Sequence, residues 1–161
     1  MELVGVRLEV PANTPVVLLR ESGGRHRLLP ILIGGPEAQA IHLAIEGVQP
    51  PRPLTHDLFK SVLDSLACDL VRVVVTEIRE HTYFAELHLR SGEGERVVSS
   101  RPSDAIALAA RFGAPIFAED ALLDEAGQEE PVETGEEEDE EILDEFRDFI
   151  ESVKPEDFGS A

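Results

Sequence analysis

The chain has 161 residues, of which 33 are acidic and 14 are lysine or arginine, so its formal net charge is -19. This length suits one domain with a hydrophobic core of its own, and the charge disfavours a broad nucleic-acid interface. The single cysteine excludes an internal disulfide, and no apolar run approaches the roughly 18 residues needed to span a membrane. We therefore expect a cytoplasmic, single-domain protein without a membrane segment or a signal peptide.

The negative charge is concentrated near the C-terminus. Residues 128–161 hold 15 acidic and 2 basic side chains, a net charge of -13, which leaves 18 acidic and 12 basic side chains, or -6, for residues 1–127. The glutamate-rich run predicts a disordered linker over 128–141, because like charges repel one another. Apolar residues at helical spacing predict an acidic amphipathic helix over 142–161. The folded domain is expected within residues 1–127.

The first part of that domain reads as three strands and a helix. Residues 3–10 alternate apolar and other side chains, and apolar runs at 16–19 and 28–33 flank a Ser-Gly-Gly turn. Alternation and short apolar runs with a turn between them predict an antiparallel meander. A largely buried helix is expected over 37–47, because its few polar residues fall on one side.

The second part starts with a proline-rich connector over 48–53, which cannot continue a helix. An amphipathic helix is then expected after Thr55, which is predicted to be its N-cap. Strands are predicted at 70–78, 83–90 and 95–100, followed by a helix from Pro102, a short strand and a short helix. The spacing in the helix from Thr55 predicts a buried stripe made of Leu58, Phe59, Val62, Leu63 and Leu66.

The two parts share an order of elements. The small-residue segment Ala40–Ala44 has a counterpart 65 residues further on, at Ala105–Ala109, and a Ser-Gly turn precedes each of them. This agreement indicates an internal repeat. We predict an α+β domain built from a duplicated β-β-β-α unit with mainly antiparallel sheet.

The start of the helix near Thr55 is the first candidate site. Free N–H groups at a helix N-terminus attract anions, and Arg52 and the Thr55 hydroxyl could complete a phosphate or carboxylate site. His56 and Asp57 add a possible base or metal ligand. The alternative is structural, with Thr55 as the helix cap, Asp57 facing the helix dipole and His56 at the surface.

A similar set of residues opens the later helix. Proline suits the first helical turn, Ser103 and Asp104 can satisfy free N–H groups, and Arg101 can pair with Asp104 or with a ligand. The two Arg-Pro elements could converge on one cleft. Glu37, which follows a glycine pair at the start of the first helix, is a third candidate, and it could also be only a favourable first-turn carboxylate.

Several well-known sites are missing from the sequence. There is no zinc-ligand spacing, no G-x-S-x-G elbow and no phosphate-binding loop with a lysine. The chain has only seven phenylalanines and one tyrosine, and no run of lysine and arginine, so a conventional nucleic-acid footprint is absent. Any nucleic acid would have to meet a local cleft that holds a few arginines.

Three strings together resemble the bifunctional nuclease domain family. They are LPILIGGPEAQAIHLAIEG from Leu29, RPLTHDLFKSVLDSL from Arg52 and RPSDAIALAARFGAPIF from Arg101, and the resemblance covers residues 1–125. It implies a duplicated α+β fold that associates into dimers. It also implies a nuclease activity like that reported for plant members, which degrade both DNA and RNA.

The resemblance suggests a mechanism for phosphodiester hydrolysis. Carboxylates commonly hold divalent metal ions that activate water, while arginines neutralise charge in the transition state. We expect Mg²⁺ or Mn²⁺ and no organic cofactor. In this hypothesis Arg52 and Arg101 bind phosphate, with help from Thr55 and Ser103. His56 is a base or a ligand, and the metal-binding carboxylates are Glu37, Asp57 and Asp104.

Two alternatives belong to other classes. The domain could be a non-catalytic dimeric module that binds an anion or a protein, with an acidic tail that docks on a basic partner or covers the domain's own cleft. The motif residues could also maintain the fold through buried Arg-Asp pairs that link the two halves.

Overall fold

The computed structural model describes residues 1–9 and 12–129. The linker expected at 128–141 lies outside this part of the chain except for its first two residues, and the helix expected at 142–161 lies outside it altogether. No helix in the described ranges is long and apolar enough to cross a membrane.

The first unit is a three-stranded antiparallel sheet followed by a helix. Its strands β1 (Glu2–Glu9), β2 (Thr14–Arg20) and β3 (Leu28–Leu32) lie side by side in chain order. The helix α1 (Gly35–Ile45) ends before Gly47, whose φ of 65° is the left-handed conformation that glycine adopts without strain.

The second unit repeats this order after an intervening helix, α2 (Thr55–Ser65). It consists of β4 (Asp69–Arg79), β5 (Thr82–Ser91), β6 (Gly94–Ser100) and the helix α3 (Pro102–Phe112). A short strand β7 (Ile116–Ala118) then pairs in parallel with β4, which gives the sheet order β6-β5-β4-β7, and α4 (Asp120–Ala126) follows. The predicted α+β class with mainly antiparallel sheet is confirmed.

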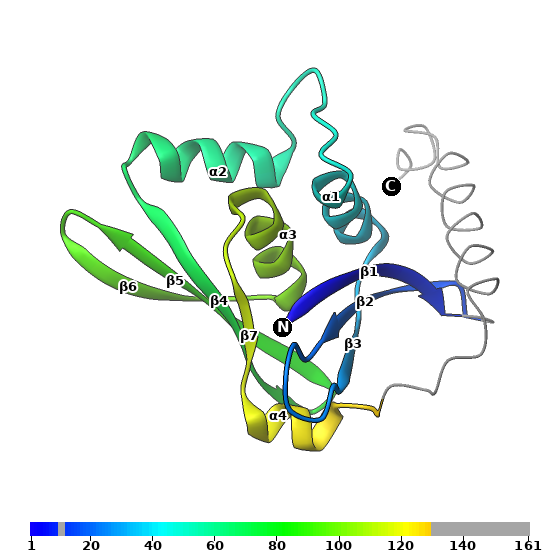
Figure 1. Ribbon diagram of the computed structural model, residues 1–161. Coiled ribbons are helices and arrows are strands. Elements are labelled where there is room, and N and C mark those ends of the chain that lie inside the picture. Colours follow the sequence, from blue (N-terminus) through cyan, green and yellow to red (C-terminus); the bar gives the residue numbers. More distant parts are fainter. Residues whose placement is uncertain (10–11, 130–161) are drawn as a thin grey trace.

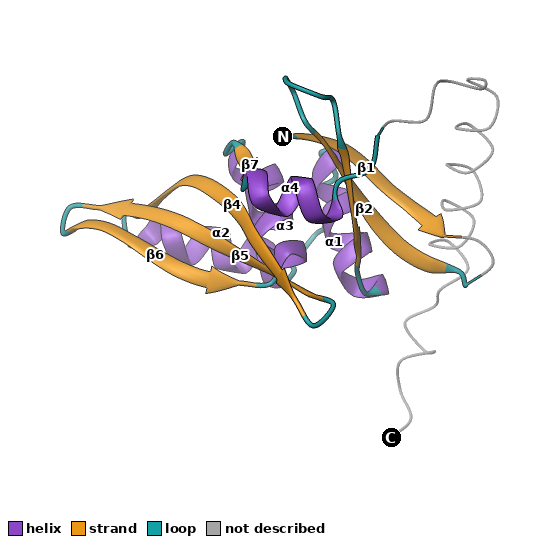
Figure 2. Cartoon of the chain, turned by 90° about the horizontal axis from the view of Figure 1, so that it is seen from below, coloured by secondary structure: helices purple, strands orange, loops and turns teal. Residues whose placement is uncertain are grey.

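The core forms where α1 and α3 pack against each other. Each helix of this pair packs on its own sheet (Figures 1 and 2), since α1 contacts β1 and β2 while α3 contacts β4 and β5. Ile41 and Ile106, one from each helix, are completely buried. The alanines of the repeated segment keep the helix surfaces small, so that the two helices can approach closely.

The expected buried stripe on α2 is wrong for all but one of its residues. Only Leu63 is buried in this helix, because α2 packs mainly against α3 and covers no sheet extensively. The periodicity of the sequence shows that a helix has an apolar side, but it does not show what lies against that side. The exposed fractions of the other members are 55% for Leu58, 43% for Phe59, 46% for Val62 and 67% for Leu66.

An ion-pair group joins the hairpin between β2 and β3 to α4. The guanidinium of Arg27 is 8% exposed, and its nitrogens lie 2.8 Å from Glu21 Oε1 and 2.8 Å from Asp124 Oδ1. Next to it, Leu28 and Gln128 exchange two backbone hydrogen bonds. These contacts fix the end of the described chain against the first sheet.

Candidate functional site

The N-terminal ends of α1 and α3 carry two of the predicted motifs. Arg101 has extended backbone at the N-cap of α3, and Pro102 is the first helical residue, as its fixed φ favours. Gly34 is the N-cap of α1. A Cβ at position 34 would meet Oε2 of Glu37, so the end of that flexible side chain would have to move aside.

The start of α2 lies one residue earlier than expected. Leu54, and not Thr55, holds the N-cap position, so Thr55 is the first residue of the helix. The cap is closed by Asp57, whose Oδ2 accepts a hydrogen bond of 2.9 Å from the backbone N–H of Leu54. A carboxylate at this position satisfies a free backbone donor and also favours the helix dipole.

Four of the predicted residues form one connected group, which we call the Arg101 cluster: Glu37, His56, Arg101 and Asp104. The Arg101 guanidinium lies between two carboxylates. Its Nη1 is 3.0 Å from Glu37 Oε1, and its Nε and Nη2 are 2.7 and 3.0 Å from the two oxygens of Asp104. His56 Nε2 is 3.0 Å from Oδ1 of Asp104. The cluster therefore joins the starts of α1, α2 and α3.

Asp104 is the electrostatic centre of the cluster. Burial raises the pKa of its carboxyl, but hydrogen bonds from Arg101 and His56 outweigh burial and hold that pKa below its usual range. Asp104 in turn raises the pKa of Arg101. Asp104 is thus ionised at neutral pH and can orient the His56 ring. Within the described chain, Nδ1 of His56 has no hydrogen-bond partner.

A hollow of about 390 Å³ opens beside the cluster. Its lining includes Gly34, Glu37, Arg101 and Ser103, with Tyr83 and apolar side chains of β3 opposite them. Neither α1 nor α3 has a side-chain cap, so the first-turn N–H groups of both helices are left without a side-chain partner. Ser103 is 7% exposed, and its hydroxyl makes no hydrogen bond to other described residues. Free backbone N–H groups and a free hydroxyl at a helix N-terminus can bind an anion.

Asp57 does not join the cluster, although it is one residue away from His56. Its Oδ1 lies 2.5 Å from Nε of Arg111, a residue of α3 whose side chain is 8% exposed. Nη1 of Arg111 also donates to the carbonyl oxygens of Ala40 and Ala107, at 2.9 and 3.0 Å. Burial raises the pKa of Asp57, but hydrogen bonds from Arg111 and from the Leu54 N–H outweigh burial. The pKa of Asp57 is therefore lower than its usual value.

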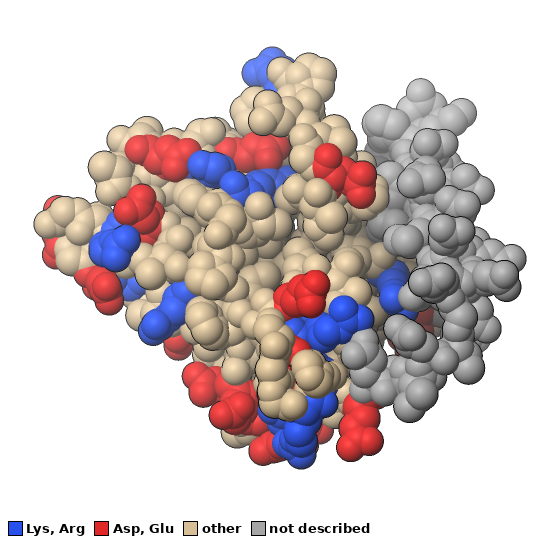
Figure 3. Space-filling view, viewed as in Figure 1, with Lys and Arg blue, Asp and Glu red and all other residues tan. Residues whose placement is uncertain are grey.

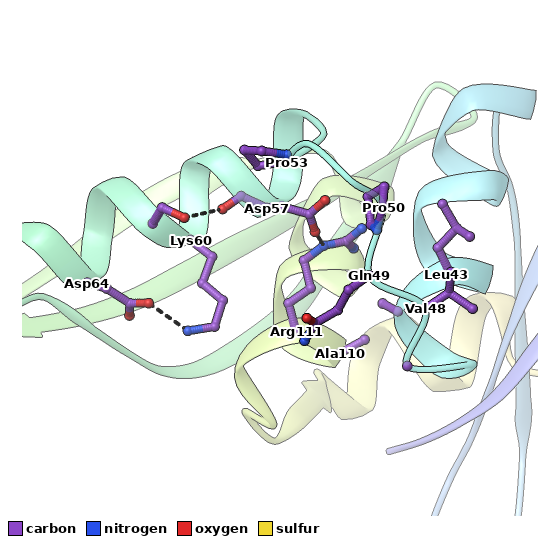
Figure 4. A pocket seen from close by; sticks show the side chains of 13 residues that line it. Leu43, Val48, Gln49, Pro50, Pro53, Asp57, Lys60, Asp64, Ala110 and Arg111 are labelled. Carbon is purple, nitrogen blue, oxygen red and sulfur yellow. Dashed lines mark hydrogen bonds and ion pairs between the residues drawn. The ribbon is translucent and has the colours of Figure 1, made fainter.

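Figure 4 shows this second location, a hollow of about 570 Å³ between α2, the end of α1 and the proline-rich connector. Lys60 and Arg111 line it together with Asp57 and Asp64. Each cation has an anionic partner, since Lys60 Nζ is 2.7 Å from Asp64 Oδ2. Sequence reasoning missed Arg111, and the only signal for it was a basic residue in the last turn of α3.

The remaining two predicted residues stand apart. Arg52 and Thr55 are exposed, and neither side chain has a hydrogen bond or ion pair with the described residues.

Within residues 1–9 and 12–129, no group of three or more His, Cys, Asp or Glu side chains is arranged to hold a metal ion. The predicted trio of Glu37, Asp57 and Asp104 is therefore not assembled, because Arg101 occupies the space between two of them and Arg111 holds the third.

The charged side chains are mixed on the face shown in Figure 3. Lysine and arginine alternate there with aspartate and glutamate, without a broad basic area. A nucleic acid would thus meet individual cations such as Arg101, whose side chain is 65% exposed, and its affinity would depend on few phosphate contacts.

Comparisons with known proteins find the same family that the three motif strings resemble. The model of the bifunctional nuclease domain matches residues 17–131. An uncharacterized protein of Mycobacterium tuberculosis (strain H37Rv) is 44% identical over 98% of this chain and 96% of its own length. Bifunctional nuclease 1 of Arabidopsis thaliana is 33% identical over 65% of this chain, and bifunctional nuclease 2 of the same plant is 34% identical over 62%. The chain spans about a third of each of these plant proteins, 33% and 31% of their lengths.

Proposed function

We propose that this chain, which belongs to the bifunctional nuclease domain family, hydrolyses phosphodiester bonds in DNA, RNA or both. One observation carries the proposal: residues from all three motif strings meet in the Arg101 cluster, although they are up to 67 positions apart in the sequence. The names of the plant relatives support the reaction class.

The hollow beside the cluster would receive the phosphate. Arg101 is an exposed cation in the lining of this hollow. Ser103, which also lines the hollow, lies in the first turn of α3, and the N–H groups of that turn have no side-chain cap. These donors would neutralise the charge that develops on the phosphate oxygens as water attacks. The two carboxylates that hold Arg101 fix its guanidinium in place, which lowers the entropy lost when substrate binds.

His56 would act as the general base. With Nε2 held by Asp104, Nδ1 can accept the proton of a water molecule whose oxygen forms the new bond to phosphorus. The ester P–O bond breaks, and its oxygen leaves with a proton from solvent. In this role Asp104 is a positioning residue for both His56 and Arg101. General base catalysis of this kind contributes about 10² to 10⁴ in rate.

Dependence on Mg²⁺ or Mn²⁺ stays a prediction. The three carboxylates expected to hold the metal each face an arginine in this structure, so we assign no step to a metal ion. Two of them, Glu37 and Asp104, share the guanidinium of Arg101. Magnesium is commonly bound by one or two carboxylates together with substrate phosphates, so the cleavage assay must include metal ions and a chelator.

The test is cleavage of single- and double-stranded DNA and RNA by the full chain, with Mg²⁺, with Mn²⁺ and with EDTA. Asp104→Asn should lower the rate by about 10² or more, because His56 loses its orienting carboxylate. Asp69→Asn is the matched control, since Asp69 is exposed on β4 and lies outside the cluster. The proposal fails if the folded wild-type chain cleaves none of these substrates, or if Asp104→Asn and Asp69→Asn cleave equally fast.

A second candidate function is favoured by a different observation. Every charged member of the Arg101 cluster already has a partner within the chain, as a structural role would require. In that case the domain is a non-catalytic module that binds an anion or a protein, and the acidic residues 128–161 dock on a basic partner or cover the domain's own hollow. Melting temperatures of the same variants separate the two, because loss of cleavage at unchanged melting favours chemistry.

A further inference from the structure

The proposed hydrolysis needs a proton for the oxygen that leaves when the ester P–O bond breaks. A positioned acid accelerates such a step by about 10² to 10⁴. His56, as the base, takes up a proton from water and cannot supply one to the leaving oxygen in the same step. A proton donor in the hollow beside the Arg101 cluster would therefore complete the site.

One histidine lines this hollow. The chain has five histidines, all within the described residues, and only His81 belongs to the lining, together with Glu37, Arg101 and Ser103. Histidine is the side chain that ordinarily changes charge closest to neutral pH, so it can both donate a proton and regain one. His81 is exposed, and its side chain makes no hydrogen bond or ion pair with the described residues. Its ring nitrogens are therefore available to a ligand.

The other polar groups in the lining are poorer acids. The Tyr83 hydroxyl already donates to the carbonyl oxygen of Pro30 at 3.4 Å, and burial raises the pKa of this hydroxyl, which makes it a weaker acid. Glu37 is paired with Arg101 at 3.0 Å, and a guanidinium does not release its protons in proteins. Serine and threonine hydroxyls ionise far less readily than an imidazolium. His81 is thus the best proton donor in the hollow.

The turn that carries His81 has an unusual sequence. Glu80 and His81 are the two residues between Arg79 and Thr82, which pair with each other, and their φ angles are 49° and 63°. Two-residue hairpin turns with positive φ at both positions strongly favour asparagine, aspartate or glycine there. Sparsely populated backbone conformations of other residues cluster at active sites. The turn thus keeps an imidazole beside the hollow where a smaller residue would suit the backbone better.

The register of the second sheet brings this turn towards Arg101. Ala85 of β5 pairs with Ser100 of β6. Because the two strands are antiparallel, the chain before Ala85 and the chain after Ser100 run in the same direction from this pair. His81 lies four residues along the first of these segments, and Arg101 begins the second. The turn and the start of α3 therefore form two walls of one hollow.

The two histidines approach the Arg101 cluster from different elements. His56 comes from α2 and contacts Asp104, whereas His81 comes from the turn between β4 and β5 and lines the hollow. In phosphoryl transfer the attacking and the leaving oxygens lie roughly in line, on opposite sides of the phosphorus. A base and an acid for this reaction must therefore reach the phosphate from two sides.

We propose that His81 is the general acid of the site. As the ester P–O bond breaks, its electron pair goes to the leaving oxygen, and that oxygen takes a proton from the His81 imidazolium in place of solvent. In the same step His56 accepts a proton from water, whose oxygen forms the new bond to phosphorus. Afterwards His81 regains a proton from solvent and His56 releases one. This assignment rests on the proposed function.

The test compares two leaving groups with the full chain. The products of an ordinary oligonucleotide identify which oxygen leaves, and a second oligonucleotide carries sulfur in place of that oxygen at one phosphodiester. A thiolate forms near neutral pH, so it leaves without help from an acid. We expect His81→Asn to slow cleavage of the oxygen-linked bond by about 10²-fold or more and to leave cleavage of the sulfur-linked bond nearly unchanged.

The matched control is His26→Asn. His26 is also an exposed histidine with positive φ, 54°, but it lies between β2 and β3 and outside the lining of the hollow. This variant should cleave both bonds as fast as the wild type. His81→Asn should melt no lower than the wild type, because asparagine tolerates positive φ. If it does not fold, His81→Gly suits the same backbone and takes its place.

Two results would overturn the assignment of His81 and leave the proposed hydrolysis intact. One is cleavage of the oxygen-linked bond by His81→Asn at the wild-type rate. The other is an equal loss on both bonds, which would mean that His81 helps to bind the substrate and does not protonate the leaving group. A wild-type chain that cleaves no oligonucleotide refutes both proposals, so the two kinds of failure are distinguishable.

Discussion

Arg111 connects three helices through a single guanidinium. It pairs with Asp57 of α2 and donates to a carbonyl of α1 and to one of its own helix. We expect Arg111→Met to lower the free energy of unfolding by about 3 kcal/mol, the lower part of the range for breaking a buried pair, because Asp57 stays partly solvated. Urea unfolding monitored by circular dichroism measures this change.

The control for Arg111 is an exposed arginine with a similar partner. Arg96 lies 2.7 Å from Glu93, but both side chains are more than two-thirds exposed, so Arg96→Met should change stability by less than about 1 kcal/mol. Equal effects of the two substitutions would show that Arg111 does not hold the helices together.

At the scale of single residues, the sequence predicted which residues stand at the helix starts better than it predicted which side chains those residues contact. Proline in the first turn of α3 and a carboxylate near each helix start follow from local backbone needs, and both are present. The contact of His56 with Asp104 crosses 48 positions, and that of Asp57 with Arg111 crosses 54. Only the packing of α2 on α3 decides these partners, which is why His56 and Asp57 point to different sites.

At the scale of elements, the hairpin between β2 and β3 depends on the ionised form of Glu21. Hydrogen bonds from Arg27 lower the pKa of Glu21 from 4.5 to about 2. A carboxyl whose pKa is lower in the folded state stabilises the fold above its unfolded pKa, and this stabilisation is lost as the pH falls. Glu21 should therefore stop holding Arg27 between pH 4.5 and about 2, which loosens the hairpin from α4.

Glu21→Gln tests this dependence. The difference in unfolding free energy between wild type and Glu21→Gln should be largest at pH 6 and shrink as the pH approaches 2, because the wild-type carboxyl becomes neutral there. Glu93→Gln, at an exposed position, should show no such trend. If the difference in unfolding free energy between wild type and Glu21→Gln stays constant from pH 6 to pH 2.5, the ionic contact between Glu21 and Arg27 is not the cause of that difference.

Strands and helices were predictable because periodicity is a local property. The alternation of residues 3–10, the apolar run at 28–33 and the helix ending at Gly47 all have counterparts in β1, β3 and α1. The failure on α2 has a physical reason: amphipathic spacing is the same for an apolar side that faces the core and for one that lies at the surface. Only the exposed fractions of Leu58 and its neighbours distinguish the two.

At the scale of the whole molecule, the repeated order of elements explains the arrangement of the site. Each unit ends in a helix, and because α1 and α3 pack together, Glu37 and Arg101 at their starts come within 3.0 Å. The sequence indicated this repeat, but it could not place α2, which lies between the units and delivers His56. The candidate site is therefore formed jointly by both units and by the helix that connects them.

The most direct measurement is a double-mutant cycle on the cleavage rate of a labelled single-stranded oligonucleotide, with folding checked by melting. If the Arg101 cluster acts as one unit, His56→Gln and Arg101→Gln should each lower the rate about 10²-fold or more, and the double variant should be little slower than either. Wild-type cleavage that neither substitution reduces would contradict a catalytic Arg101 cluster. Losses that multiply in the double variant would show that His56 and Arg101 act independently and not as one unit.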